Sequence, residues 1–211
     1  MKVVKHVLDR VVALCLLVAL SPICLVVLVL VRIKLGSPAI YHALRVGKDS
    51  RVFILHKFRS MTNETDSNGD LLDDERRLTR FGQFLRSSSL DELPSLWNVI
   101  RGDLSLVGPR PFSSVYLGMY TPLQNRRHEV LPGITGLAQV SGRNDLSWPE
   151  KFGYDLEYVD NWSIVLDLKI LIKTVGKVFG RKDISSEGHV TAPPFRGAEE
   201  GAEITRPFEH Q

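Results

Sequence analysis

An uncharged, apolar stretch near the N-terminus limits the folds that are open to this chain of 211 residues. It runs for twenty-one residues, from Val11 to Val31, with Ser21-Pro22 at its centre. That is about the length a helix needs to cross a bilayer. Proline inside a helix removes a backbone donor and clashes with the preceding turn. We therefore expect two helical halves that meet at a break at Ser21 and Pro22.

The charges around this stretch indicate where its ends lie relative to a membrane. Basic residues stand on both sides of it: Lys2, Lys5, Arg10, Arg32 and Lys34. Basic flanks favour the cytoplasmic side, so both ends are expected there, and the broken helix would enter and leave one leaflet by the same face. A plain spanning helix is the alternative, because proline is tolerated in many of them. A cleaved signal peptide fits less well, because the stretch is too long and no small-residue cleavage site follows.

The rest of the chain is long enough for one compact domain. We divide the sequence into a re-entrant membrane helix over residues 1–35, a cytosolic domain over 36–184 and a partly disordered tail over 185–211, which is rich in Gly, Pro, Glu and Ala. The net charge is +3, with local basic clusters, which favours anionic phospholipids or phosphorylated substrates as partners. Nucleic acid is not expected, because no helix-turn-helix, zinc-finger or aromatic RNA-binding pattern is found.

Local patterns predict an α+β domain that is mainly helical. The expected helices cover residues 74–85, 88–100, 151–160 and 164–179, and the expected strands cover 39–42, 52–58 and 137–140. A turn at 47–50 would join the first two strands into a hairpin. Two segments rich in Pro and Gly, 107–111 and 131–136, must be extended or turning.

The helix expected over 164–179 has a basic stripe, because Lys169, Lys173, Lys177 and Arg181 fall four residues apart. A helix that is basic on one face and apolar on another is typical of one lying in the headgroup plane of a membrane. An ordinary amphipathic helix that covers a core is the alternative.

Asp91 and Glu92 are the residues best suited to chemistry. Ser89-Leu90-Asp91-Glu92 also matches a capping box, in which Ser89 and Glu92 satisfy each other's backbone donors, so a helix cap is the alternative. Scattered basic residues on short segments favour the chemical interpretation: Lys57, Arg59, Arg86, Arg101 and Arg110. The guanidinium fork suits phosphate. Paired carboxylates beside cations at a membrane would suit phosphate chemistry with a divalent ion.

Four ordered motifs carry a resemblance to a known family. They are Lys57-Phe58-Arg59-Ser60-Met61, the segment from Arg86 to Val99 around Leu90-Asp91-Glu92-Leu93-Pro94, the segment from Gly102 to Pro111 ending in Gly108-Pro109-Arg110-Pro111, and the segment from Arg127 to Arg143 around Gly133-Ile134-Thr135-Gly136. Together they cover about residues 2–181 and resemble the bacterial sugar transferase family, the monotopic phosphoglycosyl transferases, and most closely its small members.

The resemblance implies a polyprenyl-phosphate glycosyl-1-phosphate transferase at the cytoplasmic face of the bacterial inner membrane. Asp91 would be the nucleophile that attacks the β-phosphate of a UDP-sugar and releases UMP. Undecaprenyl phosphate would then take the sugar phosphate from the covalent aspartyl intermediate, in the first membrane step of glycan assembly. Glu92 would help to hold Mg²⁺. The family's helix break also corresponds to Ser21-Pro22, which favours the re-entrant topology.

Substrate contacts follow from the same resemblance. Arg110, which is stiffened by a proline on each side, is the best candidate for the phosphate or uridine end; the other candidates are Arg86, Lys57, Arg59 and Arg143. Lys57 and Arg59 could instead anchor the domain to headgroups. Residues 142–161 resemble members that transfer acetamido-dideoxy sugars such as N,N′-diacetylbacillosamine. A galactose or glucose donor, or a non-catalytic scaffold at the membrane surface, are the alternatives.

Overall fold

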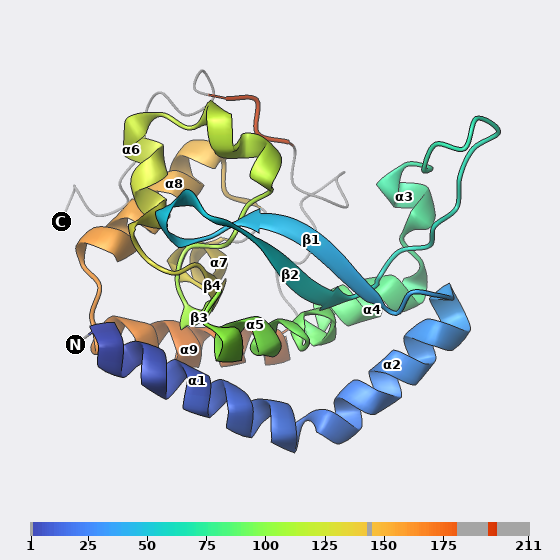
Figure 1. The fold of residues 1–211 in the computed structure, drawn as a ribbon, viewed down its shortest axis with the longest axis horizontal. Helices are drawn as coiled ribbons and strands as arrows, with labels where there is room; N and C mark the ends of the chain where they lie inside the picture. Colours follow the sequence, from blue (N-terminus) through green and yellow to red (C-terminus); the bar gives the residue numbers. More distant parts are fainter. Residues whose placement is uncertain (1, 143–144, 181–193, 198–211) are drawn as a thin grey trace.

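The computed structural model describes residues 2–142, 145–180 and 194–197 (Figure 1). Two N-terminal helices, α1 (Lys2–Ala19) and α2 (Ser21–Leu35), lie along one side of the domain and are bent by 64° relative to each other. Pro22 stands in the first turn of α2, where its missing donor is not needed. Because Pro22 has no N–H, it cannot bond to the Val18 carbonyl four residues earlier. The Ser21 hydroxyl donates to that carbonyl instead, at 2.8 Å. The predicted break at Ser21 and Pro22 is confirmed.

Across the described part of the chain, no single helix is both long and apolar enough to cross a bilayer, and α1 and α2 reach that length and hydropathy only as a bent pair. Both helices nevertheless expose many large apolar side chains, including Val7, Val11, Val18, Leu25, Val26 and Ile33. Apolar exposure on this scale marks an interaction surface.

The predicted hairpin is present as β1 (Ile40–Val46) and β2 (Val52–Phe58), which pair antiparallel. The register sets Ala43 opposite Leu55, and both are buried. Side chains alternate between the two faces of a strand, so Arg45 and Lys57 share the inward face with this pair.

A short parallel pair joins the two Pro/Gly-rich segments: β3 (Ser105–Val107) leads into the first, and β4 (Gly133–Thr135) lies within the second. The strands approach so closely that a Cβ atom on Gly133 would lie 2.1 Å from the Gly108 nitrogen. This contact fixes the backbone just before Arg110, because the Gly133 amide donates to the Pro109 carbonyl at 3.0 Å.

Seven further α-helices are assigned in the described residues, in addition to short 3₁₀ helices: α3 (Asp74–Arg77), α4 (Arg80–Ser87), α5 (Ser95–Arg101), α6 (Pro122–Asn125), α7 (Leu137–Ser141), α8 (Trp148–Asp160) and α9 (Ile164–Gly180). The last two confirm the helices predicted over 151–160 and 164–179. On α9, Lys169 and Lys173 are exposed as the basic stripe requires, whereas Arg181 lies outside the described residues.

Three predicted elements were wrong. The helix over 74–85 is two helices, because Leu78 is extended and Thr79 caps α4 by accepting the Gly82 amide. The helix over 88–100 begins only at Ser95, after Pro94. The strand over 137–140 is helix α7; a short apolar run fits either structure equally well.

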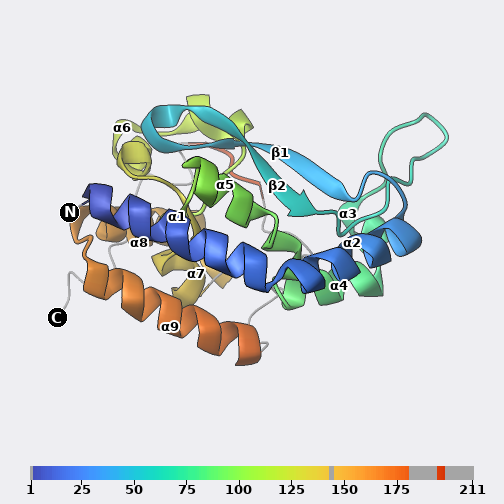
Figure 2. The ribbon, with the colours of Figure 1, turned by 60° about the horizontal axis from the view of Figure 1, so that its bottom comes forward.

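The core joins the helix pair to the domain. Helix α1 packs across α5 and β3, with Ala13, Val99 and Val107 almost fully buried (Figure 2). Helix α2 contributes Val31 to a second cluster with Leu85. The fold is therefore α+β and mainly helical, as predicted.

A third cluster consists of aromatic rings, among them Trp148, Phe152 and Phe195. Phe195 belongs to the tail predicted to be partly disordered, yet it is 2 % exposed and contacts four other aromatic rings. Residues 181–193 and 198–211 lie outside the described residues, so the prediction for the rest of the tail stays a prediction.

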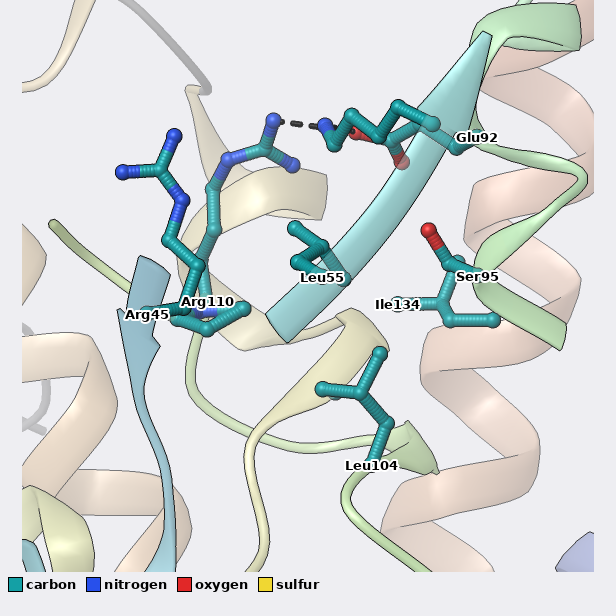
Figure 3. Close-up of a pocket in the computed structure, with 10 residues that line it drawn as sticks. Arg45, Leu55, Glu92, Ser95, Leu104, Arg110 and Ile134 are labelled. Carbon is teal, nitrogen blue, oxygen red and sulfur yellow. Dashed lines mark hydrogen bonds and ion pairs between the residues drawn. The ribbon is translucent and has the colours of Figure 1, made fainter. Parts of the chain in front are cut away.

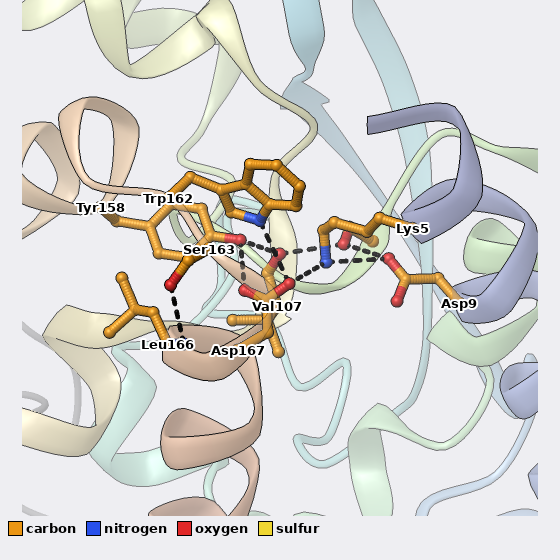
Figure 4. A network of polar contacts seen from close by, with 9 residues as sticks. Lys5, Asp9, Val107, Tyr158, Trp162, Ser163, Leu166 and Asp167 are labelled. Carbon is orange, nitrogen blue, oxygen red and sulfur yellow. Dashed lines mark hydrogen bonds and ion pairs between the residues drawn. The ribbon is translucent and has the colours of Figure 1, made fainter. Parts of the chain in front are cut away.

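A buried polar network ties α1 to α9 (Figure 4). Lys5 forms ion pairs with Asp9 at 3.1 Å and with Asp167 at 2.7 Å. The Tyr158 hydroxyl and the Trp162 indole also donate to the Asp167 carboxylate, at 2.7 and 3.2 Å. The N-terminal end of the pair α1–α2 is thus fixed to the domain by charge as well as by apolar packing.

Candidate active site

The backbone around Ser89 presents the two adjacent carboxylates. Ser89 is left-handed, with φ of 56°, and Leu90–Glu92 form a single 3₁₀ turn. A capping serine normally has extended backbone angles, and Ser89 makes no side-chain capping bond. The capping-box alternative was therefore wrong, and the Glu92 side chain is free to bond elsewhere.

Glu92 is held by two cations from different parts of the chain. Lys57 on β2 donates to Glu92 Oε1 at 2.5 Å, and Arg110 Nη2 donates to the same oxygen at 3.0 Å. Burial alone would raise the pKa of Glu92, but Lys57 and Arg110 outweigh it and hold the pKa at about 2. Glu92 is thus a fixed negative charge that positions both cations.

Asp91 has a contrasting environment. It is 8 % exposed, and its carboxylate makes no hydrogen bond to any described residue. Burial, followed by the charge of Glu92, raises the pKa of Asp91 to about 6, against the opposing pull of Lys57, Arg110 and Arg86. Neighbouring carboxylates whose pKa values are pushed apart are typical of acid–base or nucleophilic sites. Asp91 is therefore mostly ionised at neutral pH, and no described residue is hydrogen-bonded to its carboxylate.

The remaining predicted residues are only partly brought together. Arg86 on α4 donates through Nε to the Ser60 hydroxyl at 3.0 Å, and Asp91 is the neighbour whose charge most favours the charged form of Arg86. Arg59 does not belong to the cluster, because it is 6 % exposed and donates to the Ser37 carbonyl at 2.9 Å near the end of α2. Arg143 lies outside the described residues.

A cavity of about 40 Å³ opens beside Glu92, and Asp91, the preceding residue, is not among the residues that line it (Figure 3). Its charged lining residues are Arg45, Lys57, Glu92 and Arg110. A buried water needs roughly 10–15 Å³ of such volume, so the cavity could accommodate a phosphate group but not a whole nucleotide sugar. The sugar and the nucleoside would have to lie outside it.

Sequence reasoning missed Arg45. The signal that could have found it is the hairpin register, because Arg45 and Lys57 share the face that carries buried Ala43 and Leu55. The predicted strand ended at residue 42, so this alternation was not extended as far as Arg45.

The backbone of Arg110 is braced by a buried ion pair. Arg127 donates to the Arg110 carbonyl at 2.6 Å and to the Asp155 carboxylate at 2.7 Å, and the Arg127 and Asp155 side chains are at most 2 % exposed. The Arg127 guanidinium also lies 3.9 Å from the centre of the Phe112 ring. These contacts, together with the flanking prolines, restrict where Arg110 can point.

The donor set fits one mode of Mg²⁺ binding. No group of three or more His, Cys, Asp or Glu side chains converges anywhere in residues 2–142, 145–180 or 194–197, so an all-protein metal site is not present there. Mg²⁺ commonly uses one or two carboxylates together with substrate phosphates. Glu92 and Asp91 could supply that smaller set, since only one oxygen of Glu92 is bonded to Lys57 and Arg110.

Comparisons with known proteins identify the family. A family model described as "Bacterial sugar transferase" matches residues 1–181. The chain is 52 % identical to "Uncharacterized sugar transferase EpsL" of Bacillus subtilis, over 93 % of the chain and 97 % of that protein. It is 42 % identical to the "UDP-galactose-lipid carrier transferase" of Erwinia amylovora, over 84 % of the chain. It is 39 % identical to the "UDP-glucose:undecaprenyl-phosphate glucose-1-phosphate transferase" of Xanthomonas campestris, over 85 % of the chain. It spans only 40 % of the length of each of these last two relatives.

Proposed function

The chain belongs to the bacterial sugar transferase family, and from that premise we propose that it transfers a sugar-1-phosphate from a UDP-sugar to undecaprenyl phosphate and releases UMP. One observation supports this beyond family membership. Asp91 is a buried, unbonded carboxylate with a raised pKa, and it precedes Glu92, which holds two cations in the lining of a cavity large enough for a phosphate group. A nucleophile for phosphorus needs this combination of a free carboxylate and nearby positive charge.

The proposed reaction has two displacements at one phosphorus atom. In the first, an oxygen of Asp91 attacks the β-phosphorus of the UDP-sugar, and the bond to the bridging oxygen breaks, so that UMP leaves with the electron pair. In the second, a phosphate oxygen of undecaprenyl phosphate attacks the same phosphorus. The aspartyl–phosphorus bond then breaks, which regenerates the Asp91 carboxylate and gives the diphosphate-linked sugar.

Positive charge is essential for the first displacement, because a carboxylate and a diphosphate repel each other. Lys57 and Arg110 are held at the cavity by Glu92, and Arg86 lies near Asp91. Mg²⁺, held by Glu92 and the substrate phosphates, would offset further charge as UMP departs.

We also propose that α1 and α2 dip into one leaflet from the cytoplasmic face. The support is the 64° bend at Ser21-Pro22, the exposed apolar side chains of both helices and the basic residues at either end. Helix α9 adds exposed Val165, Ile172 and Val175 beside the lysines of its basic stripe, a composition suited to anionic headgroups. The phosphate of a lipid acceptor would then lie at the depth of the site.

The topology can be tested with single cysteines in a chain whose native Cys15 and Cys24 are replaced by serine. Val3→Cys and Ile33→Cys place a thiol at an exposed position on each side of the bend. A re-entrant pair keeps both in the cytoplasm, so a membrane-impermeant maleimide should label neither in intact bacterial cells and both after lysis. Labelling of one position alone in intact cells would mean that the helix spans the membrane.

The donor sugar is open between two classes. Residues 142–161 resemble members that use acetamido-dideoxy sugars, whereas the relatives from Erwinia amylovora and Xanthomonas campestris are named for galactose and glucose. The names favour the hexose donor and give no support to the diacetylbacillosamine-type donor, so both classes belong in the test.

UMP release should be measured for the purified full chain with undecaprenyl phosphate, Mg²⁺ and each of four donors: UDP-glucose, UDP-galactose, UDP-N-acetylglucosamine and UDP-diacetylbacillosamine. We expect one donor to exceed the others by at least about tenfold, since polar contacts to sugar hydroxyl or acetamido groups discriminate at that level or above. Without undecaprenyl phosphate, each enzyme molecule should release at most one UMP. No release with any donor would contradict the transferase proposal and favour the scaffold alternative.

A further inference from the structure

Arg45 is the cation in the cavity to which the mechanism above gives no role. It lies on β1, on the hairpin face that carries Lys57. Figure 3 shows its guanidinium group beside that of Arg110, on the side away from Glu92. The order across the cavity is therefore Glu92, Arg110 and then Arg45.

The pairing of charges in the cavity is incomplete. Lys57 and Arg110 share Glu92, whereas Arg45 has no carboxylate partner within the described part of the chain. Burial and the neighbouring Arg110 both lower the pKa of Arg45, and the nearby groups that favour its charge are phenols. Three cations against one carboxylate leave an excess of positive charge on the cavity wall, and such an excess attracts a polyanion.

The order of the cations indicates which part of a polyanion each one meets. Asp91 adjoins Glu92, and the cations whose charges act on Asp91 include Lys57 and Arg110. A phosphorus atom within reach of Asp91 therefore lies at the Glu92 end of the cavity. The next phosphate along a diphosphate then reaches the side where Arg45 stands.

We propose that Arg45 binds the α-phosphate of the UDP-sugar, the phosphate that leaves as part of UMP. This inference rests on the transferase function proposed above and adds a binding residue to it. As the bond between the β-phosphorus and the bridging oxygen breaks, negative charge grows on the departing phosphate, and the Arg45 guanidinium offsets it with charge-assisted hydrogen bonds. Arg45 thus acts on the nucleotide half of the donor.

The test is direct binding of UMP to the full-length protein, measured by calorimetry, so that it does not depend on turnover. Arg45→Gln should weaken UMP binding about 10- to 100-fold, the usual effect of losing a charge-assisted bond to phosphate. Arg45→Lys should recover part of the affinity. Arg51→Gln, an exposed arginine in the same hairpin, is the matched control and should bind like wild type. Thermal unfolding of each variant verifies that the hairpin is intact.

Equal UMP affinity in wild type and Arg45→Gln would overturn the inference, as would the absence of UMP binding to wild type. The kinetics separate this failure from that of the proposed function. If wild type releases UMP from a UDP-sugar and Arg45→Gln does so with unchanged kcat/KM, only the role of Arg45 is wrong. If wild type shows no turnover with any donor, the transferase function itself fails. A reduced kcat/KM for the donor with an unchanged KM for undecaprenyl phosphate supports the assignment to the nucleotide side.

Discussion

Asp91→Asn should abolish UMP release and at the same time stabilise the fold. An amide cannot form the aspartyl–phosphorus bond, so we expect turnover to fall on the order of 10³-fold or more. Asp91 is buried without a partner, and the rise of its pKa from 3.8 to about 6 is the cost of ionising it inside the protein. Removing that charge should raise the free energy of unfolding by about 2–3 kcal/mol at pH 7.

The size of this stability change depends on pH. The folded-state pKa of Asp91 is raised, so the folded protein is favoured when Asp91 is protonated, and that advantage is lost as the pH rises from about 4 to about 6. The stability difference between Asp91→Asn and wild type should therefore be near zero below pH 4 and constant above pH 6. Activity follows the ionised form, so kcat/KM of wild type should fall tenfold per pH unit below about 6.

Two controls make this result specific. Asp73→Asn changes an exposed aspartate that makes no side-chain capping bond, and it should alter neither activity nor stability. Glu92→Gln removes a charge with a lowered pKa that pairs with Lys57 and Arg110, so it should destabilise the protein. Thermal unfolding in detergent compares the stability of each of the three variants with that of wild type. If Asp91→Asn kept near-wild-type turnover, Asp91 would not be the nucleophile.

The sequence was most informative where one residue has few conformational options. Pro22 lacks a donor, so the break in the apolar stretch was predictable to the residue. The hairpin was predictable because two apolar runs flank a polar turn. Residues 137–140 were misassigned because a run of four residues, three of them apolar, fits a strand and a helix equally well, and only the packing of α7 against α8 and α9 selects the helix.

The residues of the site were predictable from motifs only in part. Asp91, Glu92, Lys57, Arg86 and Arg110 were identified from motifs, and the structure gathers them around one cavity or beside it. Arg59 belongs to the same motif as Lys57, but two residues along an extended chain give about 6–7 Å of separation, and Arg59 bonds at the end of α2 instead. Spacing along the chain does not report which of two nearby cations reaches a carboxylate that is distant in sequence.

Lys5→Ala should be the most destabilising single change in the helix pair. Lys5 is the cation that the buried carboxylates of Asp9 and Asp167 share, and all three side chains are at most 13 % exposed. Truncation leaves two uncompensated negative charges in the interior, and breaking a buried pair in this way typically costs about 3–5 kcal/mol. Lys169→Ala, at an exposed position on α9, is the control and should change stability by less than about 0.5 kcal/mol.

The loss should be recoverable, which separates charge burial from simple loss of packing. A triple variant, Lys5→Met with Asp9→Asn and Asp167→Asn, keeps side-chain volume and removes every charge, so it should regain most of the stability. After Asp167→Asn, the amide oxygen could still accept from Trp162. The amide nitrogen could donate to the Tyr158 hydroxyl, which would then donate to the Val107 carbonyl that it already contacts at 2.9 Å. If the triple variant unfolds as easily as Lys5→Ala, the network contributes directional hydrogen bonds that an amide cannot replace. Because Asp91 takes no part in the ion pairs and hydrogen bonds that join α1 to α9, UMP release by the folded triple variant should match wild type. A loss of activity would instead mean that the docking of α1 shapes the active site.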